Sequence, residues 1–256
     1  MKLTVANIQF DVLLGQVDQN RATAERLIRR AADQGARFIC LPELFTTGYD
    51  FELIKAQEPD PVFSSEIIDW FGHIARSLDI HLIAGSIPEK KEGRFYNTSF
   101  LFDGQGSMVG KYSKIHLFPP MGEDAFFTPG RECPVFETNL ATVGLSICYD
   151  LRFPAQFLDL AGKGAKIVFI PAQFPHPRLD HWRVLLRARA IENHFFVAGC
   201  NRIGRSGLSV FCGHSCIISP GGEVLAEGEE HEGLVMAEID LEEIFESRKI
   251  LTSEKK

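Results

Sequence analysis

The sequence predicts a layered α/β protein in which two β-sheets are covered by helices. Apolar strand-like segments alternate with amphipathic helical segments in both halves of the 256-residue chain. Strand-like segments without intervening helices fill its middle and its C-terminal part. The chain is 45% hydrophobic and 24% charged. A chain of this length and hydrophobic content can bury a large core. No low-complexity linker divides it, so we expect residues 1–256 to form one domain.

The first half of the chain repeats a strand followed by a helix and then continues as a meander. Hydrophobic residues run together or alternate in the strands and recur every three or four positions in the helices. The expected strands are residues 3–10, 37–44, 80–87, 95–103 and 107–114. The expected helices are residues 18–35 and 64–78, the first ending at Gly35.

The second half shows the same alternation and closes with a further meander. The expected strands are residues 134–138, 141–147, 165–172, 195–201, 208–219, 223–228 and 233–240. Three helices are expected. The first begins near Pro154, and the other two cover residues 180–194 and 240–248. Two sheets with helical covers accommodate this order of elements.

Charge and hydropathy limit the partners. The 27 basic and 34 acidic residues give a net charge of −7, and no block of five or six like charges is present. Nucleic acid and anionic membranes are therefore not expected as partners. The start "MKLTVANIQF" lacks the apolar segment of a signal peptide, and no apolar run approaches the ~20 residues of a spanning helix. We expect a cytoplasmic protein.

The six cysteines are expected to be reduced thiols in such a protein. Cys40 lies inside an apolar strand and is predicted to be a core residue. Cys133 follows Glu132, whose charge disfavours the thiolate, and Cys200 ends a strand. None of these three is favoured as a nucleophile.

Cys212, His214 and Cys216 have the residue types of a metal site. Strand residues four positions apart are separated by ~13 Å, however, which is too far for two sulfur atoms to share one zinc ion. Unless Gly213 forms a bulge, these residues belong to the core, and no metal is expected.

Cys148, in "GLSICYDLRFP", ends a strand before a turn and a helix. Active sites of α/β sheets lie at such strand ends. A cysteine nucleophile needs a base and donors for the developing oxyanion, and none of the eight histidines stands in a motif that pairs it with Cys148. Glu43 and Lys114 end strand-like stretches and could supply a base and a cation. Taken alone, each is equally well explained as a solvated charge.

Three segments in this chain order resemble the nitrilase, or carbon–nitrogen hydrolase, superfamily: "LPELFTTGYD", "GKYSKIHLF" and "GLSICYDLRFP". The resemblance implies an α-β-β-α sandwich of two mixed sheets, with Cys148 as nucleophile, Glu43 as general base and Lys114 as the cation that holds the oxyanion. It also implies a second oxyanion donor in the backbone N–H of Tyr149 and a supporting role for Glu123. No cofactor is implied.

The resemblance extends through "YDLRFP", where Asp150 and Arg152 look like a structural or pocket-ordering pair. The reaction it implies is hydrolysis of an amide C–N bond through an acyl-thioester on the cysteine. Other aliphatic amidases, N-carbamoyl amidases and nitrilases use the same triad. An inactive binding or scaffold protein with this fold is the alternative of another class.

Residues 171–204 are most similar to ω-amidases, which hydrolyse 2-oxoglutaramate and 2-oxosuccinamate. Such substrates carry a carboxylate, for which His176, Arg178 and Arg202 are candidate partners. Each could equally be a loop charge that faces solvent. Phe174 is a candidate pocket wall, with ordinary core packing as its alternative.

The resemblance further implies at least a homodimer. Its expected contact surfaces are the helices at residues 154–162 and 180–192.

Overall fold

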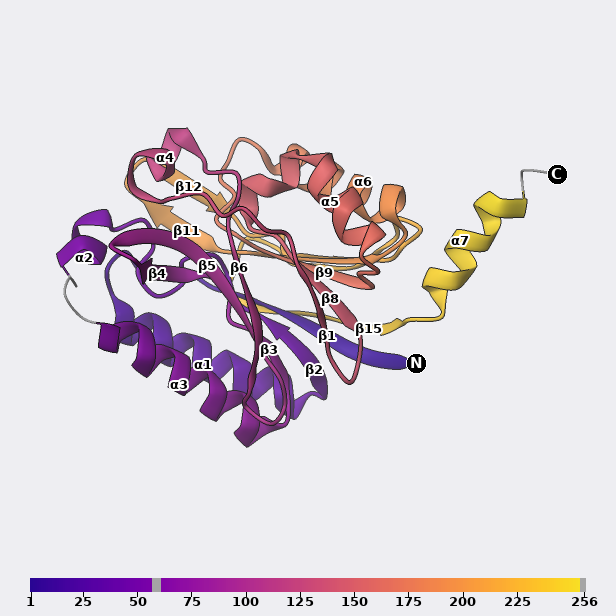
Figure 1. Cartoon of the computed structure of the whole chain (residues 1–256), viewed down its shortest axis with the longest axis horizontal. Coiled ribbons are helices and arrows are strands. Elements are labelled where there is room, and N and C mark those ends of the chain that lie inside the picture. Colours follow the sequence, from indigo (N-terminus) through magenta and orange to yellow (C-terminus); the bar gives the residue numbers. More distant parts are fainter. Residues whose placement is uncertain (57–60, 254–256) are drawn as a thin grey trace.

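The computed structural model describes residues 1–56 and 61–253. Two β-sheets pack face to face, and helices cover the outer face of each (Figure 1). α1 (Val17–Asp33) and α3 (Pro61–Leu78) cover the first sheet. α5 (Pro154–Gly162) and α6 (Leu179–Asn193) cover the second. The predicted α-β-β-α arrangement is confirmed.

The first sheet has the order β15-β1-β2-β3-β5-β4, with β6 also paired to β5. Its strands are β1 (Lys2–Gln9), β2 (Ala36–Cys40), β3 (His81–Ile83), β4 (Ile87–Lys91), β5 (Arg94–Phe102), β6 (Met108–Ser113) and β15 (Gly233–Asp240). The β1–β2 and β2–β3 pairs are parallel, and the other pairs are antiparallel. Because β1 pairs with β15, residues 2–9 and 233–240 lie side by side in one sheet. The single domain stays a prediction.

The second sheet has the order β14-β13-β10-β9-β8-β7. Its strands are β7 (Val135–Glu137), β8 (Thr142–Leu145), β9 (Ile167–Ala172), β10 (Phe196–Asn201), β13 (Cys216–Ile218) and β14 (Val224–Glu227). The three central strands β8, β9 and β10 are parallel, so their carboxyl ends lie at one edge. A separate hairpin, β11 (Ile203–Ser206) and β12 (Ser209–Cys212), follows β10.

Alternation along β1 explains how one strand serves two layers. Leu3 and Val5 face the layer between the sheets, whereas Ala6 and Ile8 pack in the cluster that contains α1 and α3 residues. This is the two-residue period of a strand buried on both faces. The sheets also meet through Phe38 and Phe169, whose ring centroids are 5.5 Å apart.

Three predicted strands are shorter than expected because the backbone turns within them. The 37–44 segment stops being a strand at Cys40, the end of β2, and Leu44 has φ 41°. Gly85 (φ 56°) ends the 80–87 segment after β3, and β4 begins at Ile87. The predicted strand 208–219 breaks at Gly213 and His214, whose φ values are 63° and 53°. Its two halves become β12 in the hairpin and β13 in the second sheet. The turn at Gly213 is therefore more than a bulge.

The remaining elements are short except for the last helix. They are α2 (Phe51–Ala56), the 3-10 turn η1 (Pro119–Met121), α4 (Glu123–Phe126), the 3-10 turn η2 (Cys148–Arg152) and α7 (Glu243–Ser253). α7 begins and ends later than the predicted 240–248 helix and projects from the body of the molecule (Figure 1). No helix in the part of the chain described here is long and apolar enough to cross a membrane.

Candidate active site

The predicted catalytic residues follow strands of both sheets. Glu43 comes three residues after β2 and Lys114 directly after β6, both in the first sheet. Cys148 comes three residues after β8 in the second sheet. Strand ends place side chains with precision because the backbone behind them is fixed by the sheet.

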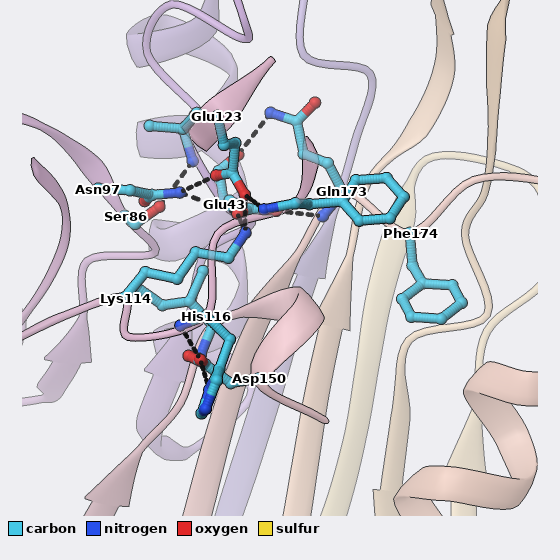
Figure 2. Close-up of polar contacts among 12 residues, drawn as sticks. Glu43, Ser86, Asn97, Lys114, His116, Glu123, Asp150, Gln173 and Phe174 are labelled. Atoms are coloured by element: carbon cyan, nitrogen blue, oxygen red, sulfur yellow. Dashed lines mark hydrogen bonds and ion pairs between the residues drawn. The ribbon is translucent and has the colours of Figure 1, made fainter. Parts of the chain in front are cut away.

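Glu43, Lys114 and Glu123 form one buried ionic cluster (Figure 2). The Lys114 Nζ atom lies 2.8 Å from Glu43 Oε1 and 2.6 Å from Glu123 Oε2, and all three side chains are fully buried. Asn97 Nδ2 donates to both carboxylates, at 2.9 Å and 3.0 Å. The Phe118 backbone N–H donates to Glu123 Oε2 at 2.7 Å. Each charge is thus paired and hydrogen-bonded, as burial requires.

Gln173, directly after β9, holds Glu43 from the second sheet. Its backbone N–H donates to Glu43 Oε2 at 2.9 Å, and its side-chain Nε2 donates to the Glu43 carbonyl at 2.8 Å. On the other side, Ser86 Oγ accepts from the backbone N–H of Leu44 at 2.9 Å. The Glu43 carboxylate and backbone are therefore both fixed.

The cluster keeps Lys114 protonated. Burial alone would lower the pKa of Lys114, but the carboxylates of Glu123 and Glu43 outweigh burial and raise it above its ordinary value. Burial raises the pKa of Glu123, with Lys114 opposing and Glu43 adding to the shift. A permanent ammonium at this position can stabilise a developing oxyanion at neutral pH.

Cys148 is the first residue of η2 and has a left-handed backbone, with φ 46°. Only 5% of the residue is exposed. Burial raises the pKa of its thiol, Glu43 raises it further, and Lys114 acts in the opposite direction. The resting group is therefore a neutral thiol, which becomes a nucleophile only when a base takes its proton.

The backbone N–H of Tyr149 is available as an oxyanion donor. Tyr149 is the second residue of η2, where helical N–H groups have no partner within the helix. Among the described residues it donates no backbone hydrogen bond, whereas the N–H of Asp150 donates to the Ile147 carbonyl at 3.0 Å. The position suits the role that the resemblance implied for it.

Asp150 connects the η2 turn, which begins at Cys148, to the segment that carries Lys114. Its fully buried carboxylate accepts hydrogen bonds from Tyr112 Oη at 2.7 Å, from the backbone N–H groups of His116 and Ile147 at 2.9 Å, and faces His116 Nδ1 at 2.8 Å (Figure 2). The structural role expected for Asp150 fits these contacts. Arg152 does not pair with it and instead donates toward His181 Nδ1 at 3.1 Å.

A small pocket opens over Cys148. Its lining residues are Phe118, Cys148, Tyr149, Arg152, Gln173, Phe174, Pro175 and Arg178. The Arg152 guanidinium lies over the Phe174 ring at 5.6 Å, and that of Arg178 lies over Phe118 at 5.7 Å. The pocket thus combines a thiol, aromatic walls and two cations.

The other two candidate cations lie elsewhere. His176 does not line the pocket, and its Nε2 lies 3.1 Å from Glu230 Oε1. Arg202 is fully buried, and its Nη2 lies 2.6 Å from Asp11 Oδ1. Each already faces a carboxylate of this chain, which disfavours a second anion as partner.

Sequence reasoning missed Asn97, Gln173 and Tyr49 as members of the site. Burial raises the pKa of the Tyr49 hydroxyl, and the charges of Glu123, Glu43 and Cys148 add to the shift, which shows that Tyr49 shares their environment. The signal for Asn97 and Gln173 was weak: Asn97 is one of three consecutive polar residues within a strand, and Gln173 is a single polar residue directly after an apolar one. Their contacts depend on the pairing of strands far apart in the sequence.

Cys212, His214 and Cys216 do not converge on a common point. Cys212 donates to the Phe174 carbonyl at 3.2 Å, whereas Cys216 lies in β13, in another sheet. The His214 ring faces Glu227 at 2.8 Å. Within residues 1–56 and 61–253, no three His, Cys, Asp or Glu side chains are arranged to hold a metal ion.

The α-β-β-α sandwich, with Cys148 in a pocket and a buried Glu43–Lys114 ion pair, indicates the class of protein. The carbon-nitrogen hydrolase family model matches residues 4–249, and the chain belongs to this family. Solved structures agree. Saccharomyces cerevisiae Nit3, a member of branch 10 of the nitrilase superfamily, superposes with a TM-score of 0.89 at 29% identity, covering 98% of this chain and 94% of that one.

Two further relatives are particularly informative. The 2-oxoglutaramate amidase of Bacillus subtilis is 42% identical over 248 residues, which span 97% of this chain and 95% of that protein. A glutamate-to-glutamine mutant of an amidase from Nesterenkonia sp. AN1, solved after Michael addition of acrylamide at its active site cysteine, has a TM-score of 0.86 at 28% identity. That match covers 98% of this chain and 99% of the amidase.

Proposed function

We propose that this chain is an ω-amidase that converts 2-oxoglutaramate or 2-oxosuccinamate to the 2-oxo acid and ammonia, with Cys148 as nucleophile. The observation that carries the proposal is the pocket over Cys148, which presents two guanidinium groups and two aromatic rings. The 42% identity to 2-oxoglutaramate amidase over nearly the whole chain supports the same substrate.

The acylation step begins with proton transfer from the Cys148 thiol to Glu43. The sulfur attacks the amide carbon, and a carbon–sulfur bond forms. The Lys114 ammonium and the Tyr149 backbone N–H hold the resulting oxyanion. Protonated Glu43 gives its proton to the amide nitrogen, the carbon–nitrogen bond breaks, and ammonia leaves an acyl-thioester.

The deacylation step uses water in place of the thiol. Glu43 takes a proton from water, the hydroxide attacks the thioester carbon, and the same donors hold the second oxyanion. The carbon–sulfur bond then breaks, the carboxylic acid leaves, and the sulfur recovers a proton from Glu43. Glu123 supports both steps by holding Lys114 at 2.6 Å.

The substrate class follows from the two pocket arginines. Among the described residues, neither Arg152 nor Arg178 forms an ion pair with a carboxylate. A guanidinium over an aromatic ring leaves its in-plane N–H groups able to meet a carboxylate. In Arg152, Nη2 also donates toward His181. We therefore assign the substrate carboxylate to this pair, with Phe174 as a wall of the pocket. His176 is a weaker candidate because it faces Glu230 at 3.1 Å.

A substrate panel read as ammonia release tests the proposal. It contains 2-oxoglutaramate, butyramide, an N-carbamoyl amino acid and an aliphatic nitrile. We expect 2-oxoglutaramate to have the highest kcat/KM. A preference for another member would assign that activity instead, and no turnover of any member would favour an inactive binding protein.

Variants of the pocket separate anion binding from chemistry. Replacing Arg178 or Arg152 by Met should raise KM for 2-oxoglutaramate about 10-fold or more, as expected for a lost charge-assisted contact. The same variants should leave hydrolysis of the uncharged butyramide within a few-fold of the wild type. Equal losses on both substrates would contradict the assignment of the carboxylate to these arginines.

The expected cytoplasmic location remains a prediction, which fractionation of the producing cells would test.

A further inference from the structure

Arg202 lies outside the substrate pocket, and every polar part of its guanidinium is occupied. Nη1 donates to Gln173 Oε1 at 3.0 Å, Nη2 to Asp11 Oδ1 at 2.6 Å, and Nε to the Ile203 carbonyl at 2.9 Å. The guanidinium carbon lies 4.3 Å from the centre of the Phe211 ring. Each of the three guanidinium nitrogens therefore already donates to an acceptor of this chain, and the Arg202 side chain is fully buried away from the pocket.

The hydrogen bonds of Gln173 make it a link between Arg202 and Glu43. Arg202 has only donors, so the Gln173 side-chain oxygen must face it. The amide nitrogen then points the other way and donates to the Glu43 carbonyl at 2.8 Å, while the Gln173 backbone N–H donates to Glu43 Oε2 at 2.9 Å. The chain of contacts runs from Asp11 through Arg202 and Gln173 to the base.

We propose that Arg202 is a positioning residue that fixes the Glu43 base through Gln173, with Asp11 as its counter-ion. For its catalytic meaning, this inference rests on the proposed function of Glu43. The contacts join segments after β1, β2, β9 and β10, which belong to both sheets. Arg202 therefore sets the position of the base on one sheet relative to a strand of the other.

The packing around Asp11 supports this role. Gly204 has φ 88°, and a Cβ atom placed on it would lie 2.0 Å from Asp11 Oδ1. Glycine at this position is what lets the carboxylate reach Arg202. Asp11 and Ile203 also form a parallel β-bridge, which holds the acid and the arginine in one register.

Removing Arg202 should disturb the base without opening the pocket. In Arg202→Met the Gln173 oxygen loses its donor while still buried, and a rotated amide would place that oxygen against the Glu43 carbonyl. Small displacements of a catalytic group reduce the rate by up to about 100-fold. We therefore expect kcat for 2-oxoglutaramate to fall about 10- to 100-fold, with KM within about threefold of the wild type.

The test compares Arg202→Met, Arg202→Lys and Asp11→Asn with Leu27→Ala. Leu27 is fully buried in α1, on the far side of the first sheet, so its truncation lowers stability without touching the contacts of Glu43. The expected order of kcat is wild type and Leu27→Ala highest, Asp11→Asn and Arg202→Lys intermediate, and Arg202→Met lowest. Lysine restores the charge and one contact but lacks the guanidinium fork.

The rate of Cys148 alkylation by iodoacetamide at neutral pH gives a readout that needs no substrate. It should fall about 10-fold in Arg202→Met, because a displaced base takes the thiol proton less well. If the wild type failed to hydrolyse 2-oxoglutaramate, this comparison would still decide the positioning role.

Three results would overturn the inference. One is a rise in KM confined to the anionic substrate, which would make Arg202 a substrate ligand. Another is a loss of kcat and of alkylation rate in Leu27→Ala as large as in Arg202→Met, which would mean that the Arg202→Met effect comes from general destabilisation. The third is unchanged alkylation in a folded Arg202→Met; if that variant does not fold, unchanged alkylation and kcat in Asp11→Asn decide against the role.

Discussion

At the scale of single residues, the environment of Cys148 explains why this thiol needs partners. It is buried to 5% exposure, and burial and the charge of Glu43 raise the pKa of its thiol. Cys200 is also buried, but its Sγ donates to the carbonyls of Ile8 and Cys40, at 3.3 Å and 3.2 Å, and does not line the pocket. The difference between the two thiols is their neighbours.

Cys148→Ala should abolish ammonia release while the protein keeps its fold, because no other thiol lines the pocket described here. Cys200→Ala is the matched control and should retain turnover, since it also removes a buried thiol at a strand end. Circular dichroism and thermal unfolding check the fold of both. Ammonia release by Cys148→Ala would refute the mechanism.

The pH dependence of alkylation should separate the two effects of Glu43. As a base it assists loss of the thiol proton, but as a charge it raises the pKa of Cys148. Glu43→Gln should therefore slow modification by iodoacetamide at pH 7. Because the variant also lowers the thiol pKa, its thiolate should appear at lower pH than in the wild type, so the two rates should converge as pH rises.

Mass spectrometry of the modified peptides gives the stoichiometry and the site of that reaction. We expect one label, on Cys148. A Glu43→Gln variant that reacted as fast as the wild type at pH 7 would exclude Glu43 as the base.

At the scale of elements, the η2 turn is held by the segment that follows β6. The Asp150 carboxylate receives donors from Tyr112, His116 and Ile147, and the His116 ring stacks on Phe153 with centroids 3.5 Å apart. These contacts couple the position of Cys148 to that of Lys114. The turn after β8 and the loop after β6 therefore behave as one unit.

Asp150→Asn should weaken that unit, because either orientation of the amide places its NH2 group against a backbone N–H, that of His116 or that of Ile147. We expect the free energy of unfolding to fall by about 1–3 kcal/mol, the cost of leaving buried polar groups unsatisfied, and kcat to fall with it. Asp159→Asn, at a carboxylate with a side chain 47% exposed, is the control and should change neither. Denaturant unfolding and ammonia release measure the effects. An Asp150→Asn variant with unchanged stability and kcat would show that η2 keeps its position without these hydrogen bonds.

At the scale of the whole molecule, we propose a homodimer that pairs through the helices of the second sheet. Leu158 on α5 and Val184 on α6 expose 68% and 65% of their surface. Together they place apolar residues on the outer helical layer of the sandwich (Figure 1). Exposed apolar residues on one outer layer are candidates for a protein interface.

The double variant Leu158→Glu, Val184→Glu should shift the protein from dimer to monomer in light scattering, because two charges would be desolvated in each copy's interface. Leu208→Glu is the control: Leu208 is fully exposed between β11 and β12, away from these helices, and the dimer should persist. A wild type that is monomeric, or a double variant that stays dimeric, would remove this surface from consideration.

The sequence by itself determined the layered class and the order of most elements, because hydrophobic periodicity records which face of each strand and helix is buried. It also determined the family, since three motifs in a fixed order carry the residues that the chemistry needs. The sequence did not reveal the backbone turns at Gly85 and Gly213, because the hydrophobic pattern of a strand continues across a glycine at which the chain changes direction.

Tertiary structure decided which charges act together. Asp11, Glu43, Gln173 and Arg202 are up to 191 positions apart, and only the pairing of two sheets brings them into one hydrogen-bonded chain. It also sorted the candidate cations: Arg178 lines the pocket, together with Arg152, which was not among the candidates, whereas Arg202 is neutralised by Asp11. A side chain's role depends on its partners and its burial, and both are properties of the folded chain.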